Sequence, residues 1–275
     1  MNPHLAKSGS ARTLLESLWL HRSLTYQLAK REVVGRYRGS MAGLAWSFFN
    51  PLLMLAVYTF VFSVIFQARW TGLEGRKGGF AIVLFVGVLV HGIFAECLNR
   101  APTLIMANTN YVKRVMFPLE ILPWVAMGSS LFHAFISLIV LVIAQLLLIG
   151  NIPPSAVVLP LIFVPLVLTT MGISYIFAAF GVYLRDIGQI TVVITTVALF
   201  LSPVFYPATA LPENYRVIFF LNPLTFIIEQ ARDAMIWGRW PHWGGLAIYT
   251  GASLVICWIG FWTFQKMRRG FADVL

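Results

Sequence analysis

The chain has 275 residues, of which 59% are hydrophobic and only 11% are charged. Because a soluble domain carries about 25% charged residues, this composition excludes an ordinary soluble enzyme or binding domain and indicates a polytopic membrane protein. The formal net charge of +10 would suggest a nucleic-acid surface in a soluble protein, but here most basic residues flank apolar runs, where they signal membrane topology. Cys97 and Cys257 lie inside apolar segments and are expected to serve packing, since their spacing fits neither a metal site nor a disulfide framework.

Residues 1–40 are polar or amphipathic, so no cleavable signal peptide is visible and the amino terminus is expected to stay in the cytosol. Thr13 and Glu16 have the spacing of a capping box, and polar residues recur at helical intervals from there to Lys30. Trp19 and Tyr26 fall on the opposite face and suit the headgroup layer. The pattern predicts an amphipathic helix lying on the membrane, with a short soluble helix as the alternative.

Six apolar runs follow, each near or above the roughly 20 residues that a helix needs to cross the hydrocarbon core. They are Leu44–Phe66, Phe80–Leu98, Ile121–Ile149, Pro153–Leu184, Ile187–Tyr206 and Gly245–Phe264. With the amino terminus in the cytosol, the larger share of the Lys and Arg residues lies on the cytosolic side, which also places the carboxyl terminus there. The fourth run carries several prolines, which predict that it is kinked or tilted or begins before the membrane.

Residues 207–244 are too apolar for an ordinary loop and too charged for a span. Asn222 and Pro223 have the form of an N-cap and a first helical residue, and Gly238 suits the end of the helix. A helix between these points is about 22 Å long, shorter than the roughly 30 Å hydrocarbon core. The segment is therefore expected to form a re-entrant or interfacial helix on the outer side, preceded by a shorter helix near Pro212–Leu221.

The predicted re-entrant helix contains Glu229, Arg232 and Asp233. At about 3 kcal/mol for each charge at the bilayer centre, a lipid-exposed span is disfavoured. The spacing of these residues allows either a local ion pair or a role in gating, and the sequence leaves both open.

The cytosolic loop between the second and third runs, residues 99–120, mixes helix formers with basic residues. Pro102 could open a short helix through Ala107, with Asn108 and Asn110 ending it. Such a loop is a plausible docking surface for a soluble partner, and a plain connection is the alternative.

The sequence contains no evident enzyme constellation. A phosphate-binding Gly-x-x-x-x-Gly-Lys-[Ser/Thr] loop is absent, so the chain does not itself bind ATP through such a loop. His91 and His133 lie in different runs without paired carboxylates or cysteines, and packing or hydrogen-bonded histidines are the expected interpretation. Glu96 is an isolated acid at a membrane border. A proton-coupled transporter is harder to exclude, although the middles of the runs lack the acidic residues that such coupling commonly uses.

The first and fifth runs carry aromatic and hydroxyl residues on one face each. In the first run this arc includes Phe48, Tyr58, Thr59 and Phe62, with Phe60 on the opposite arc. In the fifth run a narrow stripe contains Thr191, Thr195, Ser202 and Tyr206. Aromatic rings and hydroxyls could line a conduit for sugars, whereas the alternative is helix packing, which also favours Ser and Thr.

Several ordered blocks resemble the permease subunits of type-2 ABC exporters for cell-surface polysaccharides. These blocks are Arg31-Glu32, Arg36-Tyr37-Arg38-Gly39-Ser40, Gly43, Trp46, Asn50-Pro51, Tyr111 to Arg114, Phe117 to Glu120, Leu184 to Ile187, Ser202 to Pro207, Asn222-Pro223 and Gly270 to Leu275. They cover nearly the whole chain. Ala42 is a small departure, since a larger aliphatic is expected before Gly43.

The resemblance implies one transmembrane domain over 1–275: an interface helix in 1–40, five spans in 44–206, outer gate helices in 207–244, and a sixth span with a cytosolic tail in 245–275. It implies a homodimer in the bacterial inner membrane that works with two copies of a separate ATPase, which would bind ATP and Mg²⁺. The cargo would be a lipid-linked glycan such as O antigen, capsule or teichoic acid. A secondary transporter or channel for a small solute, and a membrane-embedded enzyme of the glycan pathway, remain the rival classes.

The resemblance also assigns roles to the unusual segments. The first and fifth spans would line the channel through the two polar arcs. The interface helix and the loop after the second span would contact the ATPase, through Arg31, Glu32, Arg36, Tyr37, Arg38, Asn108, Tyr111, Lys113 and Arg114. The outer gate would comprise Asn222, Pro223, Glu229, Arg232 and Asp233.

Overall fold

The computed structural model describes residues 10–67, 70, 78–112, 117–207 and 222–275, and all regular elements in this part are helices. The main helices are α1 (Ala11–Leu20), α2 (Arg22–Arg36), α3 (Trp46–Tyr58), α4 (Gly79–Arg100), α6 (Leu122–Leu148), α7 (Leu159–Tyr183), α8 (Ile187–Leu201), α10 (Pro223–Arg232) and α11 (Trp243–Met267). Short helices include α5 (Thr109–Val112) and α12 (Phe271–Val274). The predicted helix near Pro212–Leu221 lies outside the described residues. The all-α fold class is confirmed.

Five helical stretches of the described chain are long and apolar enough to cross a membrane. They are Gly43–Ile65, Gly79–Thr103, Leu119–Leu148, Pro154–Tyr183 and Trp243–Gly270. The fifth predicted run is helical only over α8, whose 15 residues extend about 22 Å. The helix ends there because Ser202 precedes Pro203, and the proline ring pushes the preceding residue into the extended conformation that Ser202 adopts.

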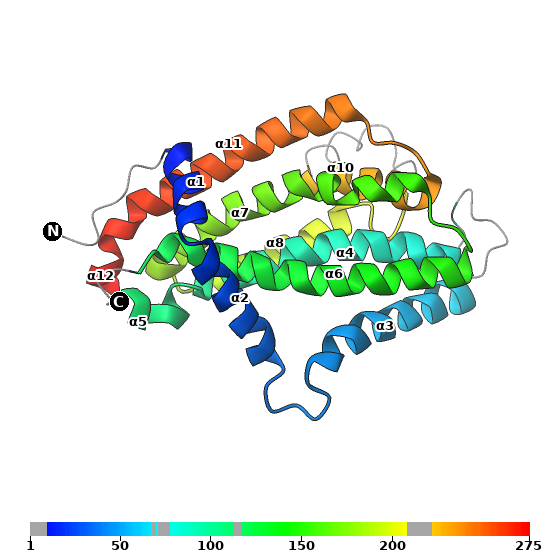
Figure 1. Cartoon of the computed structure of the whole chain (residues 1–275), viewed down its shortest axis with the longest axis horizontal. Coiled ribbons are helices and arrows are strands. Elements are labelled where there is room, and N and C mark those ends of the chain that lie inside the picture. The colour runs from blue at the N-terminus through cyan, green and yellow to red at the C-terminus, as the bar shows by residue number, and fades with distance from the viewer. Residues whose placement is uncertain (1–9, 68–69, 71–77, 113–116, 208–221) are drawn as a thin grey trace.

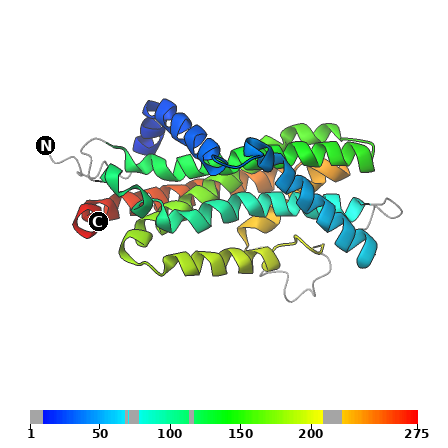
Figure 2. The same ribbon diagram turned by 90° about the horizontal axis from the view of Figure 1, so that it is seen from below.

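Helix α4 lies at the centre of the bundle, and the other long helices pack around it (Figures 1 and 2). In its most apolar stretch 72% of the residues are buried, against 6% in the corresponding stretch of α3. Contacts run from α4 to α3, α6, α7, α8 and α10. Helix α3 therefore lies along the flank of the bundle with most of its apolar surface uncovered.

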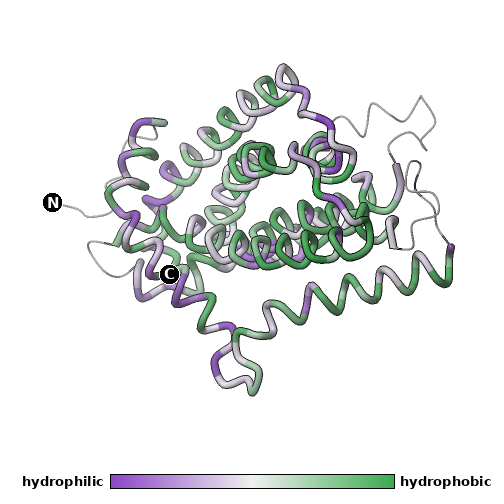
Figure 3. The backbone as a smooth tube through the Cα atoms, turned by 45° about the vertical axis from the view of Figure 1, so that its right-hand side comes forward, coloured by the Kyte–Doolittle hydropathy of each residue, from purple (hydrophilic) through white to green (hydrophobic). Residues whose placement is uncertain are grey.

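The two ends of the bundle differ in character. Helices α1, α5 and α12 lie at one end, which we call the terminal end, and α10 lies toward the opposite, distal end (Figure 1). Hydrophilic residues gather in α1, α2 and the segment that follows, whereas α4 and α6 are mostly hydrophobic (Figure 3). This separation is what a membrane-embedded bundle with a polar end requires.

The predicted amphipathic helix is divided into α1 and α2 at His21, and its cap differs from the predicted one. Ser10 is the N-cap, accepting a hydrogen bond from the Thr13 backbone at 3.2 Å. Glu16 pairs with Arg12 at 2.8 Å instead of completing a capping box. Trp19 is 73% exposed, as expected of a side chain in a headgroup layer.

Helices α7 and α11 cross at two glycines with almost no space between their backbones. A Cβ added at Gly260 would lie 2.0 Å from the Gly172 carbonyl oxygen, and one at Gly172 would lie 2.5 Å from the Ile256 carbonyl oxygen. Nearby, Thr169 donates a hydrogen bond to Ser253 at 2.8 Å. Small residues and hydroxyl pairs of this kind let membrane helices approach closely where no hydrophobic effect drives their association.

We expect Gly260→Ala to lower stability by about 1–3 kcal/mol or more, because the new methyl group overlaps the backbone of α7. The matched control is Gly251→Ala in the same helix, where the added methyl meets nothing within 4 Å. Thermal unfolding of the purified proteins in detergent measures both changes. Equal melting temperatures for the two variants would contradict close packing at Gly260.

Candidate functional site

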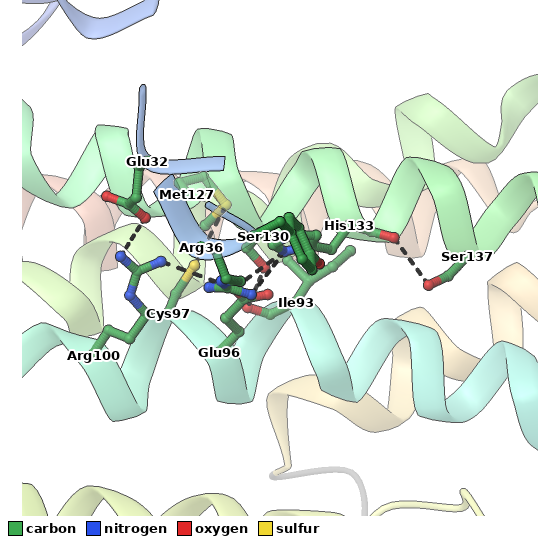
Figure 4. A network of polar contacts seen from close by, with 11 residues as sticks. Glu32, Arg36, Ile93, Glu96, Cys97, Arg100, Met127, Ser130, His133 and Ser137 are labelled. Carbon is green, nitrogen blue, oxygen red and sulfur yellow. Dashed lines mark hydrogen bonds and ion pairs between the residues drawn. The ribbon is translucent and has the colours of Figure 1, made fainter. Parts of the chain in front are cut away.

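A network of ion pairs joins α2 to α4 and α6 (Figure 4). The Arg36 guanidinium pairs with the Glu96 carboxylate and lies 3.1 Å from Nδ1 of His133. His133 Nδ1 is in turn 3.3 Å from Glu96 Oε1. Arg100 pairs with Glu32 and approaches the same Glu96 oxygen at 3.9 Å. We call these five residues the Glu96 network.

The Glu96 network neutralises its own charges. Its two arginines face two glutamates, so it leaves little net field for an anionic ligand and acts as a tie between helices. Tyr37 extends it, with its hydroxyl 3.2 Å from His133 Nε2. Burial raises the pKa of this tyrosine, which keeps the hydroxyl protonated and able to donate. Arg36 and Tyr37, predicted to contact a partner, therefore contact α4 and α6, although Arg36 keeps 38% of its side chain exposed.

Beside the Glu96 network a cavity of about 290 Å³ lies between α3, α4 and α6. Its polar end is formed by the network, and Ser47 and Asn50 extend the polar lining along α3. The remaining walls are mostly apolar. The cavity therefore separates α3 from the core over part of its length, which agrees with the low burial of that helix.

The side of α2 that carries Arg31 meets the loop after α4. Arg31 donates a hydrogen bond to the Tyr111 hydroxyl at 2.9 Å, and the Tyr111 ring stacks on Phe117 with centroids 4.1 Å apart. Arg31, Glu32, Asn108 and Tyr111 share the lining of a small cavity of about 140 Å³. Four of the predicted partner-contacting residues thus gather at one place although about 80 residues separate the two segments. We call this place the α2–loop surface.

The remaining partner predictions have different outcomes. Arg38 is exposed in the turn after α2. Lys113 and Arg114 lie outside the described residues. The loop itself differs from the predicted pattern, since α5 begins at Thr109 and the Asn108–Asn110 segment does not terminate helical structure.

Arg232 in α10 is the largest fully buried polar side chain among the described residues, with 1% of its surface exposed. Its guanidinium donates to three backbone carbonyls: Val83 at 3.1 Å, Pro203 at 2.5 Å and Val204 at 2.9 Å. The Trp70 ring lies 4.7 Å from the guanidinium carbon. Because the chain leaves the helix after α8, the Pro203 and Val204 carbonyls lack helical partners, and Arg232 supplies the donors that they need.

The predicted local ion pair is present, but Arg232 makes more contacts with backbone carbonyls than with Glu229. Arg232 Nη1 lies 3.3 Å from Glu229 Oε1, whereas Asp233 pairs with Arg239 at 3.7 Å. Burial lowers the pKa of Arg232 to about 10, so the guanidinium remains charged at neutral pH. Burial raises the pKa of Glu229 and of Asp233, against the opposing effect of the neighbouring arginines.

The bounds of the re-entrant segment agree with the prediction. The Asn222 side chain caps α10 by accepting from the Leu224 backbone at 2.9 Å, and its amide donates to Ser202 Oγ at 2.9 Å. Pro223 is the first helical residue. A π-helix, Asp233–Trp237, extends α10 to Gly238, whose φ of +71° ends it. The segment packs against α4 and α7 in the bundle.

The structure describes all four residues of the predicted channel stripe in the fifth run, and three of them are buried. Thr191, Thr195 and Ser202 are buried, and each hydroxyl donates to a carbonyl of its own helix. Thr195 also donates to the Asn99 side chain at 3.1 Å, and Tyr206 donates to the Phe200 carbonyl. Of these hydroxyls, the one of Thr195 contacts α4, through Asn99.

The polar arc of α3 has a different environment. Phe48 is 38% exposed and Tyr58 is half-buried, while Thr59 donates to the Leu55 carbonyl. Phe62 stacks on Phe80 with centroids 5.2 Å apart. Helix α4 lies between α3 and α8 (Figure 2), and Phe62 also stacks on Phe205, just beyond the end of α8, with centroids 6.3 Å apart. The role of either arc in a channel stays a prediction.

One buried ion pair was missed by the sequence reasoning. Arg268 Nη1 and Glu120 Oε2 lie 2.6 Å apart, with 8% and 2% of the side chains exposed. Ser17 donates to the same carboxylate at 2.9 Å, and Tyr175 donates to the Glu120 backbone carbonyl at 2.8 Å. This pair ties α1, α7 and the carboxyl-terminal segment together. Glu120 ends the Phe117–Glu120 block that carries part of the family resemblance, but nothing in the sequence indicates its partner.

Comparison with known proteins gives a consistent family. A profile of the family described as ABC-2 type transporter matches residues 23–236. The O-antigen export system permease protein RfbA of Myxococcus xanthus is 29% identical over 263 residues, covering 94% of this chain and 98% of the relative. An RfbA of Klebsiella pneumoniae is 25% identical, covering 90% and 93%. The polysialic acid transport protein KpsM of Escherichia coli is 22% identical, covering 87% and 91%.

We expect Arg232→Met to lower the free energy of unfolding by about 3–5 kcal/mol, because three buried carbonyls and Glu229 would lose their donor. The matched control is Arg239→Met, which removes an arginine whose side chain is 74% exposed and should change stability by about 1 kcal/mol or less. Unfolding of both variants in detergent gives the comparison. Similar losses in the two variants would show that the carbonyl contacts of Arg232 contribute little.

Proposed function

The chain belongs to the ABC-2 type transporter family, and we propose that it is the permease subunit of an ATP-driven exporter of a lipid-linked polysaccharide. The observation that carries the proposal is similarity over almost the whole length to permeases named for two different polysaccharides, O antigen and polysialic acid. The family and the span-length helices make the chain a multi-pass membrane protein. The rival classes, a small-solute transporter and a glycan-pathway enzyme, gain no support from these relatives.

The proposed cargo is O antigen, with a capsular polysaccharide as the second candidate. The identity to the RfbA permeases, 29% and 25%, exceeds the 22% identity to KpsM. A polymer of this kind, assembled on a lipid in the cytosol, must cross the bacterial inner membrane. That location and a cytosolic terminal end are part of the proposal.

A separate ATPase would supply the energy, and we place its contact at the α2–loop surface. The supporting observation is that Arg31, Glu32, Asn108 and Tyr111 converge there from two distant segments at the terminal end. ATP and Mg²⁺ would bind to that partner, since this sequence lacks a phosphate-binding loop. No cofactor is assigned to the permease.

A second copy of the chain would complete the transport path. Support comes from the first span-length stretch, Gly43–Ile65, of which only 6% of the most apolar part is buried, and from α8, which exposes Val193 and Phe200 on the side away from α4. Exposed apolar faces on the outside of the bundle suit an interface within the membrane. In such a homodimer the polar arc of α3 would face the path between the copies.

Helix α4 gives a physical route between the proposed ATPase contact and the proposed gate. Glu96 near one end holds α2 through Arg36, and Val83 near the other end accepts from Arg232. The two positions are 13 residues apart, or about 20 Å along one buried helix. We infer that displacement of α2 by the ATPase is carried to α10 by movement of α4 as a rigid element.

Deleting the chain should abolish surface polysaccharide while the lipid-linked polymer accumulates inside the cell, because the path across the membrane is missing. Immunoblots of intact and lysed cells measure the two pools. Restoring the wild-type chain should restore export only when an active ATPase partner is present. Normal surface polysaccharide in the deletion strain would refute the proposed function.

The same export assay tests the polar arc of the first span with a matched pair of variants. Tyr58→Ala, on the polar arc, should slow export severalfold, since one aromatic contact is worth about 1 kcal/mol. Phe60→Ala lies on the opposite, 58% exposed side and should have little effect. Membrane abundance of both variants controls for folding. A larger loss with Phe60→Ala would reverse the assignment of the two faces.

Topology can be tested with single cysteines. Gly75→Cys and Asn214→Cys should react with an impermeant thiol reagent added to intact cells, whereas Asn110→Cys should react only after the cells are opened. Cys97 and Cys257 are buried and give a low background. Labelling of Asn110→Cys from outside would overturn the cytosolic assignment of the terminal end.

A further inference from the structure

A groove of about 670 Å³ lies between α2 and α6 near the terminal end. Its walls are two helical stripes with a spacing of four residues: Arg22, Tyr26 and Lys30 on α2, and Trp124, Gly128 and Phe132 on α6. Residues four apart lie above one another on a helix, so both stripes run along the groove. Figure 1 shows α2 crossing α6 obliquely at this place.

The close approach of the two helices fixes the shape of the groove. A Cβ added at Gly128 would lie 3.1 Å from the Ala29 Cβ, so the helices are near contact at the floor. Tyr26 and Phe132, on either side, leave the space between them unfilled. The groove therefore results from the way in which the two helices pack, and the side chains that line it leave its volume open.

The lining has two chemical parts. Arg22 and Lys30 are exposed, and their positions on α2 are about 12 Å apart. Beyond them the lining is apolar except for Thr25 and reaches Leu44, at the start of the first span, and Phe132, within the third. The residues that line the groove include two cations and no acidic side chain. A ligand that fits must carry an anionic head and an apolar tail.

We propose that this groove binds one anionic glycerophospholipid of the surrounding membrane. Its phosphate would lie between Arg22 and Lys30, and an acyl chain would follow the apolar wall toward Leu44. The exposed aromatic rings of Trp19 and Tyr26 place this part of the chain at headgroup level. The proposal needs only that the chain is a membrane protein, and it is independent of the transported cargo.

A soluble protein partner fits this face less well. The groove faces away from the Arg31 part of the α2–loop surface, because Arg31 lies on the opposite side of α2 from Arg22 and Tyr26. Its deep end is bounded by residues of span-length helices, which the hydrocarbon core surrounds. The position therefore favours a lipid over the ATPase.

The test is lipid binding by the purified full chain in detergent, with phosphatidylglycerol and phosphatidylcholine of identical acyl chains as probes. Native mass spectrometry counts the retained lipid, and titration gives its affinity. We expect one phosphatidylglycerol to bind at least tenfold more tightly than phosphatidylcholine. Equal retention of the two lipids would overturn the proposal.

The double variant Arg22→Gln, Lys30→Gln should lose this preference, with a loss of about fivefold for each cation, the equivalent of about 1 kcal/mol near an anionic surface. The matched control, Arg185→Gln with Arg269→Gln, removes the same charge from exposed sites outside the groove lining and should keep the preference. An equal loss in the control would show that net charge alone attracts the lipid, against a built site.

A third variant keeps both cations and fills the apolar part. Val34 lines the groove and is 46% exposed, so Val34→Trp should obstruct the tail without disturbing the core, and lipid retention should fall. Two competitors complete the test. Displacement of phosphatidylglycerol by a lower concentration of polyprenyl phosphate, or by the ATPase partner, would assign the groove to the cargo lipid or to the ATPase and overturn the proposal.

Discussion

The burial of α4 is the constraint on which the rest of the bundle depends. A helix with 72% of its apolar stretch buried needs neighbours on nearly every side, and α3, α6, α7, α8 and α10 supply them. Both ends of α4 also carry charged or strongly polar contacts, to Arg36 through Glu96 and to Arg232 through the Val83 carbonyl. The most buried of the span-length helices is thus the one that reaches both candidate functional regions.

The charges that lie between helices are accompanied by partners that compensate them. The Glu96 network balances two arginines against two glutamates, and Glu120 and Arg268 form a pair with a further donor from Ser17. Arg232 is compensated mainly by backbone dipoles. Removing a single partner leaves the other charge uncompensated, which lowers stability most where the pair is buried, as it is for Glu120 and Arg268.

The distribution of uncovered surface separates three kinds of contact. Helices α3 and α8 expose apolar faces along the bundle, which suit a second copy of the chain. The α2–loop surface gathers polar residues at the terminal end, where a soluble ATPase could reach them. The groove on the other side of α2 combines cations with an apolar wall, which suits a lipid. Helix α2 thus lies between the proposed partner and the proposed lipid.

The sequence by itself determined the elements whose cause is local. Apolar length predicted the long helices, and Asn222, Pro223 and Gly238 predicted the bounds of the re-entrant segment, because caps and left-handed glycines act within a few residues. The ordered blocks were sufficient to indicate the family. The end of α8 could also have been found, since Pro203 follows Ser202.

Only the tertiary structure decided which polar residues meet. Arg36 and Glu96 are 60 residues apart, and Glu120 and Arg268 are 148 apart, and no periodicity encodes such pairs. The stripe of Thr191 and Thr195 shows the same limit. Helical spacing established that one face of α8 is polar, but whether that face meets another helix or an open path depends on which neighbour covers it, and here that neighbour is α4.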